Sequence, residues 1–296
     1  MNLPLPKVLS PLALFSLVLV AACAADAVPF EDAPPTDPGS DAAADPRPFE
    51  FPDAAGDVGP AKADGGSCDP PDLLIILDRS ESMSASVGSQ GSRIDLAISA
   101  IKSITQAPTD TSVRFGLQVL PQIGGAECST QLVVPMNLGA SQPIANALTT
   151  MSPQLSYGTP IGAALQSALT TLAKVKVANR PQYLLLITDG AECCSCNTND
   201  YDLAVAQQLA KAGIKTFVVG FGGDDDPVLL NNLACAGGTA ANFPTGCTCT
   251  SAGCAVSPSV DSKTTSLYFK ASDGLTLKKA LASVTNQACC GCNLPN

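Results

Sequence analysis

Two short, largely apolar runs, each followed by an aspartate, constrain this chain more than any other feature. Residues 73–77 (Leu-Leu-Ile-Ile-Leu) precede Asp78, and residues 183–188 precede Asp189. Runs of this length suit strands buried on both faces of a parallel sheet, because they are too short for free-standing helices. Open α/β sheets place their ligand sites at the carboxyl ends of such strands. Both aspartates are therefore predicted to lie at the ligand-binding edge of a sheet.

Strand and helix patterns alternate along the chain after Cys68. The interval 113–120 alternates like a half-buried strand, and 131–136 looks like its antiparallel edge partner. Further strands are predicted at 215–220 and 267–270, and helices at 92–104, 143–151, 161–174, 203–210 and 273–284. The helix starts carry capping residues, such as Ser92 followed by Asp95, Asp226 before Pro227, and Asp273. This alternation predicts an α/β fold, a doubly wound and mostly parallel sheet with one antiparallel edge strand.

Residues 1–23 are typical of an export signal. Lys7 precedes the apolar stretch 12–20, which is too short for a membrane span. The ending Val20-Ala21-Ala22-Cys23 resembles the bacterial lipoprotein signal, which implies cleavage before Cys23 and acylation of its thiol. Ala24 follows Cys23, and in that sorting scheme this favours the outer membrane or cell surface. The alternative is an ordinary signal cleaved near Ala25.

Residues 24–67 are predicted to be a disordered linker. They contain ten acidic residues against only Arg47 and Lys62, so they supply −8 of the formal net charge of −10. Such an acidic segment, rich in Ala, Asp and Pro, buries too little apolar surface to fold and should act as an extended tether. Residues 68–296 then form one domain with little net charge and no basic patch, which argues against nucleic acid as a partner.

Thirteen cysteines in an exported chain favour disulfides. If Cys23 carries lipid, twelve candidates remain, an even number whose pairing the sequence leaves open: Cys68, Cys128, Cys193, Cys194, Cys196, Cys235, Cys247, Cys249, Cys254, Cys289, Cys290 and Cys292. The alternative is a zinc–thiolate site, which the absence of histidine from the chain disfavours. Residues 235–263 lack periodicity and are interpreted as a Cys-rich insertion held by disulfides.

Oxygen-bearing side chains cluster at the ends of the two apolar runs. Asp78, Ser80 and Ser82 form Asp-x-Ser-x-Ser, Thr159 opens a predicted helix within Gly-Thr-Pro, and Asp189 precedes a glycine. This set resembles the metal-ion-dependent adhesion site of the von Willebrand factor A domain family, over roughly residue 68 to the C-terminus. The alternative is that the hydroxyls only cap turns.

The resemblance implies a role for each of the five residues. Ser80 and Ser82 would touch a divalent metal directly, Thr159 would do so when a partner is bound, and Asp78 and Asp189 would act partly through water. Mg²⁺ suits such oxygen ligands, with Mn²⁺ or Ca²⁺ as alternatives. Some relatives also carry a disulfide that joins the domain's ends, which implies a clasp from Cys68 to Cys289 or Cys290.

The predicted function is binding rather than catalysis. Without histidine, Ser-His-Asp and Cys-His arrangements are excluded, and Ser-x-x-Lys at 99–102 lacks its partner motifs. The resemblance implies a non-enzymatic, lipid-anchored module that binds a protein partner. An Asp or Glu of the partner would complete the coordination of the metal. One alternative is a structural, disulfide-stabilised surface protein in which the metal only stabilises the fold. Another is metal-assisted hydrolysis.

Overall fold

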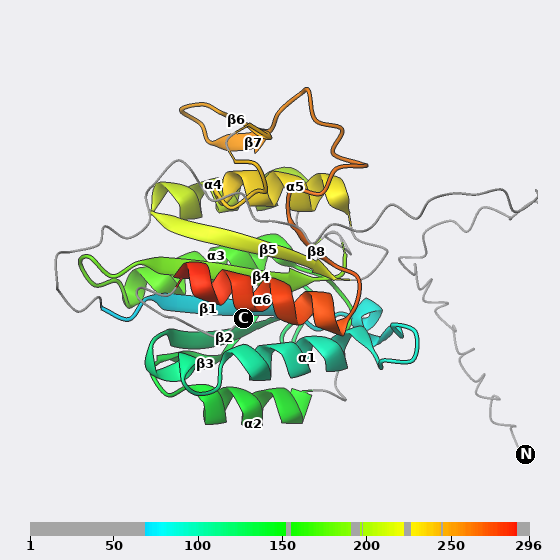
Figure 1. Ribbon diagram of the computed structural model, residues 1–296, viewed down its shortest axis with the longest axis vertical. Coiled ribbons are helices and arrows are strands. Elements are labelled where there is room, and N and C mark those ends of the chain that lie inside the picture. Colours follow the sequence, from blue (N-terminus) through cyan, green and yellow to red (C-terminus); the bar gives the residue numbers. More distant parts are fainter. Residues whose placement is uncertain are drawn as a thin grey trace, which may run out of the picture. The chain divides into compact units, whose positions relative to one another are not determined.

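The structure is a computed structural model of the 296-residue chain, and it describes residues 69–151, 155–190, 196, 198–221, 226–243 and 245–288. Within them, six strands form one sheet in the order β3-β2-β1-β4-β5-β8 (Figure 1). All neighbouring strands are parallel except β2 and β3. The strands are β1 (Asp72–Asp78), β2 (Arg114–Leu120), β3 (Gln131–Asn137), β4 (Gln182–Thr188), β5 (Ile214–Phe221) and β8 (Phe269–Ala271).

Helices cover both faces of this sheet. The helices are α1 (Arg93–Ile104), α2 (Ser141–Met151), α3 (Ile161–Lys174), α4 (Asn199–Lys211), α5 (Pro227–Ala236) and α6 (Gly274–Ala288), with short 3₁₀ turns at Glu81–Ser84 and Thr109–Thr111. One core contains buried residues of α1, α2 and α6, and the other contains those of α3, α4 and α5. The predicted doubly wound sheet with one antiparallel edge strand is therefore confirmed.

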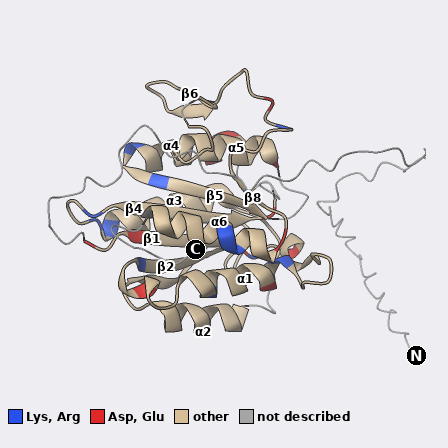
Figure 2. Ribbon diagram, in the orientation of Figure 1, with Lys and Arg blue, Asp and Glu red and all other residues tan. Residues whose placement is uncertain are grey.

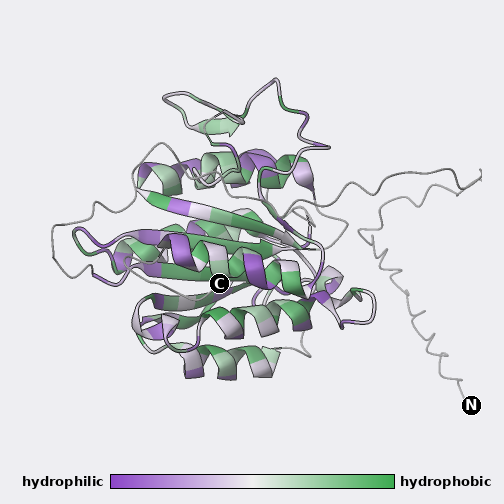
Figure 3. Cartoon of the chain, viewed as in Figure 1, coloured by the Kyte–Doolittle hydropathy of each residue, from purple (hydrophilic) through white to green (hydrophobic). Residues whose placement is uncertain are grey.

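The central strand β1 contributes buried side chains to both cores. Leu73, Ile75 and Leu77 belong to the α1 side, whereas Leu74 and Ile76 belong to the α3 side. The central strands are correspondingly apolar along their length (Figure 3). Because alternate side chains of a strand point to opposite faces, an unbroken aliphatic run is what a strand covered on both sides requires. The register pairs residue 77 with residue 187 on β4, so the carboxyl ends of β1 and β4 lie side by side.

The expectation that β2 is half-buried is wrong. Residues 115–120 are all buried, including Gln118. This glutamine faces α3, where its side-chain nitrogen donates to the carbonyl of Ala164 at 2.8 Å and to the hydroxyl of Thr130 at 3.0 Å. A polar residue in an alternating pattern suggested a solvent face, but these bonds offset part of its desolvation beneath a covering helix.

The insertion after α5 is held by disulfides and by α5 itself. Its hairpin, β6 (Cys247–Cys249) and β7 (Cys254–Val256), lies beyond α5 in Figure 1, and disulfides join Cys235 to Cys247 and Cys249 to Cys254. The fully buried Asn231 of α5 donates to the carbonyls of residues 262 and 265 and accepts from the amide of residue 267. The absence of periodicity in the sequence therefore corresponds to a cross-linked segment whose described regular structure is limited to this short hairpin.

Several predictions concern residues outside the described ranges. These are the export signal with Cys23, the linker 24–67, the clasp between Cys68 and Cys289 or Cys290, and the candidates Cys193, Cys194 and Cys292. Across the described residues, charged side chains of both signs are scattered over the elements (Figure 2). No helix in the described part of the chain is long and apolar enough to cross a membrane.

Candidate metal centre

Asp78 shapes the loop that follows β1. One oxygen of its carboxylate accepts the backbone N–H of Ser80 at 2.8 Å, which is the local turn that aspartate favours. The other oxygen accepts the hydroxyl of Thr188 at 2.6 Å. Thr188 ends the neighbouring strand β4, and the sheet register places it beside Asp78. Asp78 therefore ties the β1 loop to the end of β4.

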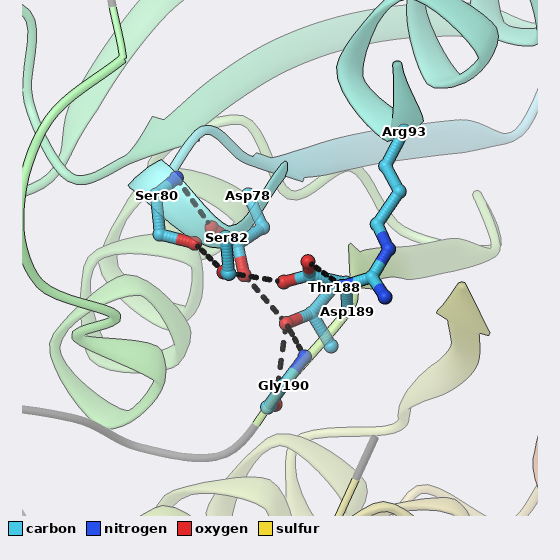
Figure 4. Close-up of polar contacts among 7 residues, drawn as sticks. All are labelled: Asp78, Ser80, Ser82, Arg93, Thr188, Asp189 and Gly190. Atoms are coloured by element: carbon cyan, nitrogen blue, oxygen red, sulfur yellow. Dashed lines mark hydrogen bonds and ion pairs between the residues drawn. The ribbon is translucent and has the colours of Figure 1, made fainter. Parts of the chain in front are cut away.

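Three further predicted residues meet at this edge (Figure 4). The hydroxyls of Ser80 and Ser82 are 2.9 Å apart, and Ser82 Oγ donates to Asp189 Oδ1 at 2.8 Å. Asp78 and Asp189 are 0% and 1% exposed and Ser80 is 3% exposed, whereas Ser82 is exposed. The structure thus brings four of the five predicted residues together in a cluster that is buried on its carboxylate side and reaches solvent at Ser82.

Thr159, the fifth residue, lies on a segment that the structure brings to the same edge. A parallel bridge pairs Ser156 with Ser80, and the amide of Ser156 donates to the carbonyl of Arg79 at 3.2 Å. Thr159 itself is 5% exposed and directly precedes Pro160, the N-cap of α3. Among the described residues, its hydroxyl makes no hydrogen bond with the other four predicted ligands. The fold therefore places the segment that carries Thr159 beside the β1 loop at Ser156.

Arg79 holds that segment in place. It is 1% exposed, and its Nη1 donates to the carbonyl of Pro121 at 3.1 Å and to the hydroxyl of Ser156 at 3.3 Å. Burial lowers the pKa of Arg79, and the neighbouring charge of Asp78 partly opposes that shift. One guanidinium thus connects the β1 loop, the end of β2 and the segment before α3. This role cannot be predicted from the sequence, because nothing local in Asp-Arg-Ser indicates a buried arginine.

Replacing Arg79 by methionine is expected to destabilise the domain by about 2 kcal/mol, because two hydrogen bonds to a charged group are lost from a buried site. Metal binding should weaken as well, since the Ser156 segment that carries Thr159 loses its anchor. Urea unfolding measures the first effect, and Mn²⁺ titration of the folded variant measures the second. A variant with unchanged stability and unchanged Mn²⁺ affinity would show that Arg79 is not an anchor.

Two other features fix the rim of the cluster. Gly158 has a φ of +99°, and an added Cβ there would lie 2.7 Å from the carbonyl oxygen of Glu127, so only glycine permits this close approach. Next to Glu127, Cys128 forms a disulfide with Cys196, and the two Cα atoms are 5.0 Å apart. The loop between β2 and β3 is therefore bound to the chain beyond Asp189. All six cysteines in the described residues form disulfides, so Cys196, Cys247 and Cys249 are not zinc ligands in this structure.

The start of α3 is packed closely against α4. An added Cβ at Gly162 would collide with the carboxylate of Asp202 and the ring of Tyr201. Asp202 is fully buried in the first turn of α4, and a carboxylate beside the amino end of α3 is stabilised by that helix's dipole. Close packing at Gly162 therefore holds the first turn of α3, and with it the Thr159 segment, against the domain.

Arg93 is a member of the cluster that sequence reasoning missed. Its Nη1 lies 2.7 Å from Asp189 Oδ2, and the two side chains are 9% and 0% exposed (Figure 4). The pattern of residues 92–95 predicts only a helix cap, and Ser92 does accept the amide of Asp95 as the N-cap of α1. The available signal was a basic residue in the first helical turn, where the helix dipole disfavours positive charge.

The electrostatics of the cluster favour an added cation. Burial and, to a smaller extent, the nearby charge of Asp189 together raise the pKa of Asp78 to about 7, while hydrogen bonds from Thr188 and Ser80 act in the opposite direction. Of the two carboxylates in this cluster, Asp189 pairs with Arg93, and Asp78 lies near the charge of Arg79. A positive ion beside them would stabilise their ionised forms.

The donor set fits a hard divalent cation such as Mg²⁺. It consists of carboxylate and hydroxyl oxygens, the ligands that Mg²⁺ prefers. In the described part of the chain, no three Asp, Glu or Cys side chains are grouped so as to hold a metal. A cation at this edge would therefore take some of its ligands from the neutral hydroxyls of Ser80, Ser82 and Thr159.

These features define an α/β domain with a hydroxyl–carboxylate cluster at the carboxyl edge of its central strands. The model of the von Willebrand factor type A domain matches residues 72–246, which is more than half of the chain. The chain belongs to this family. No curated protein sequence matches the chain.

Solved structures share the fold at low sequence identity. Proximal thread matrix protein 1 (PTMP1) of the mussel byssus, in a structure with a zinc-occupied MIDAS motif, aligns with a TM-score of 0.52 and 16% identity over 75% of this chain and 49% of its own. The pilus adhesin SpaC of Lactobacillus rhamnosus GG aligns with a TM-score of 0.53 and 15% identity, over 74% of this chain and 30% of its own. Manganese-loaded TRAP of Plasmodium vivax aligns with a TM-score of 0.50 and 17% identity, over 74% of each chain. The chain spans about half the length of the mussel protein, so these likenesses concern the domain fold.

Proposed function

We propose that this chain is a lipid-anchored protein of the cell envelope whose domain binds a protein partner through a divalent cation, most simply Mg²⁺. An aspartate or glutamate of the partner completes the coordination. The observation that carries the proposal is the contact of Ser82 with both Ser80 and Asp189, which joins the β1 loop to the end of β4 across 107 residues. Two chain segments that are far apart in the sequence thus supply oxygen atoms at one edge.

Each side chain has a physical role in this proposal. Ser80 and Ser82 bind the cation as neutral ligands, Thr159 joins them when the partner is present, and Asp78 and Asp189 supply negative charge, partly through water. Neutral ligands leave the cation incompletely neutralised. When bound, the metal supplies a Lewis-acidic coordination position for an external carboxylate oxygen. The exposed side of the cluster, at Ser82, is where such a group would approach.

The structural relatives support binding rather than catalysis. One is named as a pilus adhesin and one as a thread matrix protein, and two were solved with zinc or manganese. In this proposal the protein is not an enzyme, and nucleic acid is not among its partners. Mn²⁺ or Ca²⁺ would serve as alternative cations.

The proposal extends to the organisation of the whole chain. Residues 1–23 act as the export signal, with Cys23 acylated, residues 24–67 tether the domain, and residues 68–296 form it. Several acyl chains give stable anchoring where one would not. The domain would then lie at the outer membrane or cell surface, and intact-mass analysis of the membrane-extracted protein tests this assignment at Cys23.

The insertion favours a second candidate function. Two disulfides and the buried Asn231 make the β6–β7 segment a rigid feature on the outside of α5. In this second candidate function, the chain is a structural surface protein. The insertion makes the contacts with other molecules, and a metal only stabilises the fold. EDTA separates the two: loss of partner capture with the fold retained supports the metal-mediated proposal, and retained capture supports the second.

A conservative pair of serine variants tests the site. Ser82→Ala is expected to weaken Mn²⁺ binding about thirtyfold, because one ligand of a near-octahedral ion is lost. Ser84→Ala is the matched control, since Ser84 is exposed in the same 3₁₀ turn. Calorimetric titration with Mn²⁺ gives both affinities. Equal affinities for the two variants would refute the assignment of Ser82 as a ligand.

A further inference from the structure

Arg93 occupies a position that its own helix does not explain. It is the first residue of α1, and its backbone N–H donates to the carbonyl of Ala85 at 2.9 Å. Positive charge in a first helical turn opposes the helix dipole, and burying a guanidinium is costly without a charged partner. The side chain nevertheless lies buried against Asp189, with Nη1 and Oδ2 2.7 Å apart. Its position is thus explained by the cluster rather than by the helix.

The two oxygens of Asp189 serve different elements. Oδ1 accepts the hydroxyl of Ser82, from the β1 loop, and Oδ2 pairs with Arg93, from α1. A divalent cation held by Ser80, Ser82 and Asp189 would therefore share Asp189 with a fixed positive charge. Like charges at such short range in a buried site repel strongly.

We propose that Arg93 is the counter-charge built into this site: it pairs with Asp189 when no metal is bound, and it weakens the binding of the divalent cation. It also leaves the loaded site with a net positive charge, which favours an anionic group from the partner. Arg93 is thus a positioning and affinity-setting residue of the same centre, and its effect on the metal rests on the proposed function.

The test compares Arg93→Gln with a matched control at the other end of β1. There Arg114 pairs with the buried Asp72, with Nη1 and Oδ1 2.8 Å apart, at a similar distance but away from the proposed ligands. Each variant of the whole mature chain is titrated with Mn²⁺ alone, and its thermal unfolding is followed in EDTA and in saturating Mn²⁺. Arg93→Lys, which keeps the charge, is measured in parallel.

The expected result is selective for Arg93. Arg93→Gln should bind Mn²⁺ about tenfold more tightly than the parent, because the competing charge is gone. Its unfolding temperature should drop in EDTA and recover in Mn²⁺, so the gain on adding metal exceeds that of the parent. Arg93→Lys should resemble the parent, and Arg114→Gln should lose the same stability with and without Mn²⁺ at unchanged affinity. Unchanged or weaker Mn²⁺ binding by Arg93→Gln, or an equal loss of stability in both conditions, overturns the proposal.

A double variant covers the case in which Arg93→Gln does not fold in EDTA. Arg93→Gln with Asp189→Asn removes both charges together and should unfold in EDTA at a higher temperature than Arg93→Gln alone; failure to do so refutes the pairing. If the parent binds no Mn²⁺, the proposed function fails and the metal half of this inference fails with it. The comparison in EDTA still decides whether Arg93 and Asp189 pair.

Discussion

Replacing Asp78 by asparagine is expected to lower the affinity of the domain for Mn²⁺ or Mg²⁺ about a thousandfold, while the metal-free domain keeps its fold. Asp78 contributes one of the two carboxylates of the cluster, and Mg²⁺ tolerates little departure from its preferred oxygen shell. The fold should persist because burial already disfavours the ionised form of this side chain, as its raised pKa of about 7 shows. Calorimetric titration and urea unfolding of the same sample give both quantities.

Asp72→Asn is the matched control for this variant. Asp72 begins the strand that Asp78 ends, and both side chains are fully buried. Asp72 accepts hydrogen bonds from Arg114 and Gln182, at the edge of the sheet opposite the cluster. Its replacement should therefore leave Mn²⁺ affinity unchanged. Comparable losses of affinity in the two variants, or parent-like binding by Asp78→Asn, would contradict a metal site at the carboxyl end of β1.

In EDTA, the contribution of Asp78 to the free energy of unfolding is expected to fall by about 4 kcal/mol between pH 4 and pH 7. The pKa of Asp78 is raised from 3.8 to about 7 in the folded chain, first by burial and then by the charge of Asp189. Between these values the folded state holds a proton that the unfolded chain has released. The stabilisation is therefore complete below about pH 4 and is lost as the pH rises through about 7.

Urea unfolding of the parent and of Asp78→Asn in EDTA measures this contribution as a difference. The subtraction is needed because Asp261 and Asp273, whose pKa values are lowered by hydrogen bonds from neighbouring groups, act in the opposite direction. In Mn²⁺ the sign should reverse, since binding to an ionised carboxylate releases the proton and the apparent affinity rises towards pH 7. Parallel pH profiles for the two proteins in EDTA would refute the shifted pKa of Asp78.

The local sequence pattern was sufficient to predict an element wherever that element's own residues decide its structure. Helix α3 has the bounds that the sequence predicted, and Asp226 and Asp273 cap α5 and α6 as expected, accepting amides from the first turns of those helices. The last strand β8 begins two residues later than predicted, at Phe269. Boundaries of this kind depend on the neighbouring strand, because the pairing of β8 with β5 begins only at Phe269.

The local sequence pattern was misleading where a buried polar side chain forms hydrogen bonds with residues far along the chain. Gln118 suggested a solvent face for β2, yet it bonds to Ala164 on α3, 46 residues away. Arg79 and Arg93 carried no signal of burial, because their partners Ser156 and Asp189 are 77 and 96 residues distant. In each case the compensating group belongs to another element, and no window of sequence contains both partners.

The sequence by itself determined the α/β class, the order of most elements and the family to which the residues at positions 78, 80, 82, 159 and 189 point. The class and the order of the elements follow from short-range periodicity, and the family follows from the resemblance of these motifs; both are properties of the chain before it folds. Only the tertiary structure decided that Arg93 pairs with Asp189, that Arg79 holds the Ser156 segment and that Cys128 is joined to Cys196. Such pairings depend on strand register and helix packing, which bring together side chains that are far apart along the chain.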